Sequence, residues 1–162
     1  MKMSLFFVLY FSLIIPPQKK IQTSQTFHKQ DFYKGMLSEN LIEVNALFIS
    51  TKTVSLPDRD AYEGALLMKK SDLIDNKKTK LSLFRTGKQK LDSTILENDE
   101  NCEFRLLRLM IQENAPQILG YNKQINEDCI LIKKKFSSST VLLQNIILDY
   151  SKKSKKLKLA DF

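Results

Sequence analysis

The sequence feature that most constrains the fold is the stretch from Asn101 to Gly120, together with the segment 79–98 that precedes it. Between positions 102 and 113 most side chains are apolar, and the few polar ones cover only a narrow part of a helix. Such a helix is stable only when other elements surround it. We therefore predict that 101–120 contains the central core helix of a helical bundle or stack.

Apolar residues recur at helical spacing in most other parts of the chain. The sequence contains only 4 Gly and 4 Pro, which favours helices over turn-rich β architecture. Together these features predict an all-α fold of six or seven antiparallel helices joined by short turns. The expected helical segments are 27–38, 41–49, 57–74, 79–98, 101–115, 122–136 and 140–150.

Individual residues mark several helix ends and contacts. Ser38 or Asn40, later Asp99 or Asn101, and then Asn122 are suited to cap the helices that follow them. Gly64 lies inside the predicted helix 57–74, where it costs about 1 kcal/mol relative to Ala. Close approach of a neighbouring helix would compensate for that cost.

The N-terminus has the pattern of an export signal. Lys2 precedes an apolar run from Leu5 to Ile15 that only Ser12 interrupts. As a helix this run would span roughly 16 Å, against a hydrocarbon thickness of roughly 30 Å. The chain therefore divides into a signal peptide or short anchor (1–20), a linker (21–26), a helical domain (27–151) and a basic C-terminal tail (152–162). We expect an exported protein of the periplasm or cell envelope.

The excess of positive charge is concentrated near the two ends of the chain. Of the formal net charge of +8, Lys2, Lys19 and Lys20 belong to the predicted signal segment, so the helical domain is closer to neutral. A lysine cluster in the C-terminal tail could contact an anionic membrane surface. The alternative is that it forms a solvated helix end. Its members are Lys152, Lys153, Lys155, Lys156 and Lys158.

The segment from Leu91 to Leu109 resembles the junction between two tetratricopeptide repeats. Leu91, Thr94 and Ile95 match the end of a second repeat helix, and residues 97–101 match the acidic, Asn-containing turn that follows it. This resemblance implies a helical stack whose first-type helices line a concave groove for a protein or peptide. The whole chain is also similar to small exported bacterial proteins of unassigned function.

Candidate binding residues follow from that resemblance. Arg105, Arg108 and Gln112 are spaced at i, i+3 and i+7, so they share one face of the central helix. Arg binds carboxylates in a bidentate manner, which implies a stripe for a peptide carboxylate, with Tyr62 and Lys69 facing the same groove.

A structural role for both arginines is the alternative. They would then pair with acids of the same domain, such as Glu97, Asp99 or Glu103.

Catalytic and metal-binding patterns are weak. His28 is the only histidine and lies beside the linker, and no zinc spacing, calcium loop or Gly-rich phosphate loop is present. We expect no catalytic residue, no metal and no cofactor. Aromatic residues do not alternate with the tail lysines, so a nucleic-acid partner is not expected either. Whether Cys102 and Cys129 form a disulfide is left open by the sequence.

The sequence thus predicts an exported, non-enzymatic module that binds a protein or peptide. A peripheral membrane protein held by its basic tail is the alternative, and a hydrolytic enzyme is a weaker one.

Overall fold

The computed structural model describes residues 26–162. The predicted signal segment and residues 21–25 of the predicted linker lie outside the described residues.

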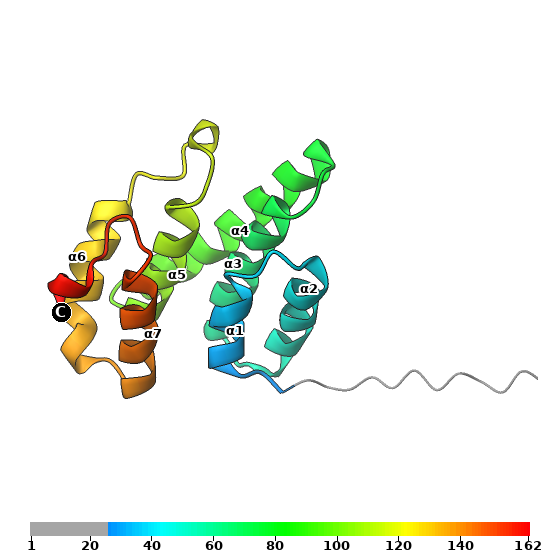
Figure 1. The fold of residues 1–162 in the computed structure, drawn as a ribbon. Coiled ribbons are helices and arrows are strands. Elements are labelled where there is room, and N and C mark those ends of the chain that lie inside the picture. The colour runs from blue at the N-terminus through cyan, green and yellow to red at the C-terminus, as the bar shows by residue number, and fades with distance from the viewer. Residues whose placement is uncertain (1–25) are drawn as a thin grey trace, which may run out of the picture.

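Residues 26–162 form seven α-helices and no β-strand, which confirms the all-α prediction (Figure 1). Consecutive helices contact each other from the first to the sixth. Short 3₁₀ turns complete several of the connections. The helices are α1 (Lys29–Gly35), α2 (Leu41–Ser50), α3 (Asp58–Asp72), α4 (Lys77–Glu97), α5 (Cys102–Gln112), α6 (Ile125–Lys135) and α7 (Val141–Ser151).

Helix α5 is the centre of the domain, as the sequence predicts. Every residue from Cys102 to Gln112 is buried, including the charged ones. In Figure 1, α5 lies between α6 and α7 on one side and α1 to α4 on the other. The charged side chains of α5 must therefore find their partners inside the protein.

Helices α3 and α4 form a long hairpin held by two glycines in direct contact. A Cβ built on Gly64 would lie 2.9 Å from the carbonyl oxygen of Gly87, and one built on Gly87 would lie 2.5 Å from that of Gly64. These distances leave no room for any side chain, which confirms the close approach predicted at Gly64. The turn between the two helices projects away from the core (Figure 1).

Several predicted helix ends are confirmed by their capping hydrogen bonds. The side chains of Asn40 and Asn101 accept backbone N–H groups at the starts of α2 and α5. Asn122 was expected to cap the sixth helix, and this prediction is wrong. Helix α6 begins at Ile125, after Gln124, which makes no capping bond with its side chain.

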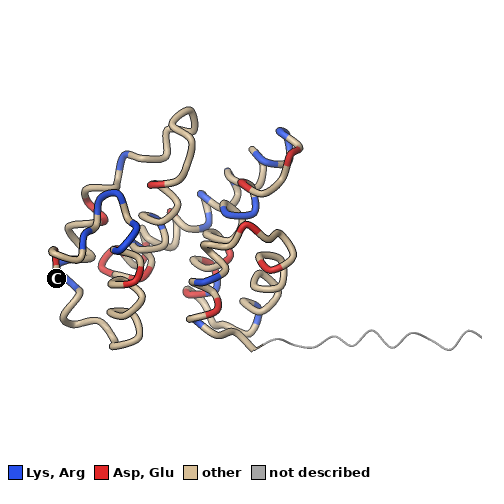
Figure 2. Tube along the Cα trace, in the orientation of Figure 1, with Lys and Arg blue, Asp and Glu red and all other residues tan. Residues whose placement is uncertain are grey.

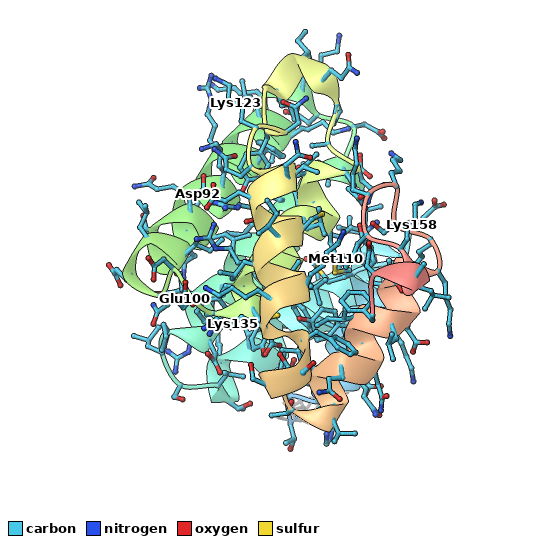
Figure 3. The ribbon with its side chains drawn as sticks, turned by 90° about the vertical axis from the view of Figure 1, so that its left-hand side faces the viewer. Asp92, Glu100, Met110, Lys123, Lys135 and Lys158 are labelled. Atoms are coloured by element: carbon cyan, nitrogen blue, oxygen red, sulfur yellow. The ribbon has the colours of Figure 1, made fainter. Side chains whose placement is uncertain are left out.

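The C-terminal segment 152–162 folds back onto the domain. Leu157 is fully buried, and the rings of Phe162 and Phe136 lie 4.4 Å apart. Lys133 of α6 pairs with Asp161 at 2.7 Å. Figure 3 shows Lys158 on this segment at the edge of the molecule, on the opposite side of α6 from the Lys135–Glu100 ion pair.

No helix within residues 26–162 is both long enough and apolar enough to cross a membrane.

Candidate functional site

Glu103 connects the start of α5 to α1 and α3. Its carboxylate accepts hydrogen bonds from the hydroxyls of Tyr62 at 2.7 Å and Tyr33 at 3.2 Å, and it pairs with Lys29 at 2.7 Å. Burial raises the pKa of both tyrosines, and the adjacent carboxylate raises each pKa further. Both hydroxyls therefore remain protonated donors at neutral pH, and the cluster is internally satisfied.

Arg105 and Arg108 lie on the opposite side of α5 and face α6. Arg108 makes a bidentate bond to Asp128, from Nε to Oδ2 at 2.8 Å and from Nη2 to Oδ1 at 2.6 Å. Arg105 contributes a further bond to Asp128 Oδ1 at 3.2 Å and also pairs with Glu127. Asp128 is fully buried, so these bonds compensate two guanidinium groups that have little contact with water.

The stripe of Arg105, Arg108 and Gln112 is therefore covered by other parts of the chain. Gln112 donates from Nε2 to Gln124 at 2.9 Å. Its Oε1 is the one buried side-chain nitrogen or oxygen atom within residues 26–162 that has no hydrogen-bond partner. The arginines use their donors within the domain, and the acids involved are Asp128 and Glu127 of α6 rather than the carboxylates expected from the sequence.

Glu113 connects the end of α5 to α7 and the C-terminal segment. The hydroxyl of Tyr150 donates to this carboxylate, and Ser154 Oγ donates to it at 2.8 Å. The backbone N–H of Lys156 donates to the same carboxylate at 2.7 Å. Burial and the hydrogen bond from its hydroxyl to Glu113 raise the pKa of Tyr150. Glu113, the C-cap residue of α5, thus holds the C-terminal segment against that helix.

A wide opening in the described structure lies between the end of the α3–α4 hairpin and the loop that follows α5. It is a cavity of about 400 Å³ that we call the large hollow. In Figure 1, the two parts that border it project from the same side of the molecule. Three methionines line it together with other apolar residues. The apolar lining is Met36, Leu37, Met68, Leu81, Phe84, Met110, Ile111, Ala115, Pro116, Ile118, Leu119 and the ring of Tyr150.

A second cavity of about 310 Å³, which we call the small hollow, lies between α1 and α7. Leu37, Met110 and Tyr150 line both hollows, so the two adjoin. We refer to both together as the apolar groove. Met110 of α5, labelled in Figure 3, is buried and lines both cavities.

Some apolar residues of the groove face solvent. Ile118 is 94% exposed, Leu37 is 44% exposed and Leu81 is 38% exposed. Leu81 of α4 lines the large hollow and is not part of the buried core. Exposed apolar side chains that border a concave surface are typical of sites that bind a partner or ligand.

The candidate residues from the sequence are distributed over separate places. Lys69 lines the large hollow, whereas Tyr62 bonds Glu103, and Arg105 and Arg108 bond Asp128. The tail lysines are exposed, and Lys153 among them lines the small hollow. The structure therefore does not bring the proposed stripe and Lys69 to one groove.

The apolar groove itself was not found from the sequence. Its lining comes from α1, α3, α4, α5, α7 and one loop, and no local motif connects them. The available signals were weak: Ile118 and Leu119 lie two and three residues after Pro116, and three of the 5 methionines lie in different predicted helices.

The described residues offer no metal-binding cluster of His, Cys, Asp and Glu side chains. Cys102 and Cys129 are both buried and free. Burial raises the pKa of the Cys129 thiol to about 11. A thiol with this pKa is a poor nucleophile at neutral pH.

Comparisons with protein-family models, with curated proteins and with solved structures found no match to this chain.

Proposed function

We propose that this chain is an exported, non-enzymatic interaction module of helical-repeat type that binds a segment of a partner protein in the apolar groove. The observation that carries the proposal is the pair of adjoining hollows with exposed apolar residues at the opening. An elongated groove of this kind suits a peptide with two apolar anchor side chains. The three methionines also favour peptide binding, because their flexible side chains adapt to different anchor side chains.

Two further observations support the wider proposal. The sequential packing of α1 to α6, together with the resemblance of 91–109 to tetratricopeptide repeats, supports the helical-repeat class. The apolar run from Leu5 to Ile15 supports export to a periplasm or cell envelope.

Replacing Ile118 with Asp tests the groove. Ile118 is almost fully exposed, so the substitution removes no core contact, yet it places a carboxylate beside the large hollow. A suitable probe is an uncharged amphipathic peptide of about 16 residues with apolar side chains at i, i+3, i+4 and i+7 and one Trp. Because the protein contains no Trp, the fluorescence of the probe reports its burial directly. We expect the Kd of the probe to rise about tenfold or more in the Ile118→Asp variant.

The matched control is Ile42→Asp. Ile42 is 79% exposed on α2 and does not line the groove, so the same chemical change is made elsewhere. The control should bind the probe as the wild type does. Equal weakening by both substitutions, or none by either, would mean that the groove is not the binding site.

A peripheral membrane role is the second candidate, and one observation favours it. In the C-terminal segment every third residue, Ser151, Ser154 and Leu157, is buried. The five lysines between and beside them are all exposed. Exposed lysines suit anionic lipid headgroups at about 1 kcal/mol per lysine.

Liposome sedimentation with anionic vesicles tests this role. The full chain is compared with a variant in which the five lysines are changed to Gln. The membrane role predicts that binding is lost in the variant, and unaltered sedimentation would exclude a role for these lysines.

A further inference from the structure

The apolar groove has a strongly uneven distribution of charge. Lys69, Lys77 and Lys80 line the large hollow, where Asp72 is the only acid. Lys34 and Lys153 line the small hollow beside Asp149, which itself pairs with Lys152 outside the lining, while Lys34 pairs with Asp31 at 3.8 Å. The groove therefore has an excess of positive charge.

The three lysines of the large hollow are available to a ligand. Within residues 26–162 none of them takes part in an ion pair. They come from the ends of α3 and α4, on one wall of the hollow. This differs from Arg105 and Arg108, whose charges are compensated by Asp128.

The opposite wall of the large hollow is uncharged. It is formed by the loop after α5 through Asn114, Ala115, Pro116, Ile118 and Leu119. Figure 2 shows this contrast: Lys and Arg positions lie on the projecting end of the α3–α4 hairpin together with acidic ones, whereas the tip of the loop carries no charged residue. A ligand in the hollow thus meets a basic wall on one side and an apolar wall on the other.

We propose that the groove selects an acidic amphipathic segment of a partner protein. Its apolar side chains would lie against the methionines and the loop, and its carboxylates would face Lys69, Lys77 and Lys80. This inference rests on the proposed function, because it names the chemistry of the peptide that the groove takes. Charges at the edge of an apolar site mainly determine which partners are accepted.

Three Trp-containing peptides with identical apolar positions test the selection. Their outer positions carry Glu, Gln or Lys, and each is titrated into the full 162-residue chain. We expect the acidic peptide to bind about tenfold more tightly than the neutral one, and the basic peptide to bind most weakly. Added salt should reduce the difference, because exposed charges are screened.

Substitutions assign the preference to particular lysines. Changing Lys69, Lys77 and Lys80 together to Gln should remove the advantage of the acidic peptide and leave the neutral one unaffected. The matched control changes Lys70, Lys78 and Lys123, which do not line either hollow, and should keep the preference.

The outcomes separate the two proposals. Equal affinity for acidic and neutral peptides would overturn the charge selection and leave the proposed function standing. Failure of all three peptides to bind would overturn both. Binding of sodium dodecanoate, with no binding of any peptide, would also overturn both and would indicate a site for a small aliphatic anion.

Discussion

Replacing Asp128 with Asn is expected to lower the free energy of unfolding by about 3–5 kcal/mol. The substitution keeps the size of the side chain but removes the only fully buried carboxylate that compensates Arg105 and Arg108. Two guanidinium groups would then remain inside the protein with no adequate counter-charge. Urea denaturation followed by circular dichroism measures the effect.

Glu127→Gln is the matched control for this prediction. Glu127 also pairs with Arg105, but its side chain is 61% exposed, so its loss should cost at most about 1 kcal/mol. A small, equal loss in both variants would contradict a structural role for the arginines. It would also favour the hypothesis that their charges are available to a peptide carboxylate.

Replacing Gly87 with Ala is expected to destabilise the protein by about 2–3 kcal/mol. In an exposed helix this change stabilises, because Ala has the higher helix propensity. Here the new Cβ would lie 2.5 Å from the carbonyl oxygen of Gly64 and 2.9 Å from Leu67 Cβ. Backbone atoms cannot yield locally, so α3 and α4 must separate. Thermal or urea unfolding detects the loss.

Gly35→Ala provides the comparison. A Cβ there would meet Leu47 Cδ1, the end of a flexible side chain that can rotate away. We expect a change within about 1 kcal/mol. If Gly87→Ala were as stable as the wild type, the close contact of the two helices in Figure 1 would not exist in solution.

The helical architecture could be predicted because its signals are local. Periodicity located each helix, and Asn40 and Asn101 placed two of their starts. The prediction of a cap at Asn122 was wrong because it rested on the residue type alone. The chain continues through a turn after Asn122, and α6 begins only at Ile125.

The location of the site could not be predicted, because it depends on tertiary contacts. The spacing of Arg105 and Arg108 correctly placed them on one face of α5. It could not indicate that Asp128 of α6, 20 residues after Arg108 in the chain, would cover that face. Likewise, the exposure of Leu81 depends on the loop opposite to it, which leaves a cavity there rather than a filled core.

The central claim is that the apolar groove is the binding site, and the methionines test it most directly. The sequence has 5 methionines; Met36, Met68 and Met110 line the large hollow, and the other two, Met1 and Met3, precede the described residues. We would label the methionine methyl groups with ¹³C, assign them by single Met→Leu substitutions, and titrate the neutral Trp peptide. We expect the methyl signals of Met36, Met68 and Met110 to shift together with the Trp fluorescence. Peptide binding that leaves these three signals unchanged would contradict binding in the apolar groove.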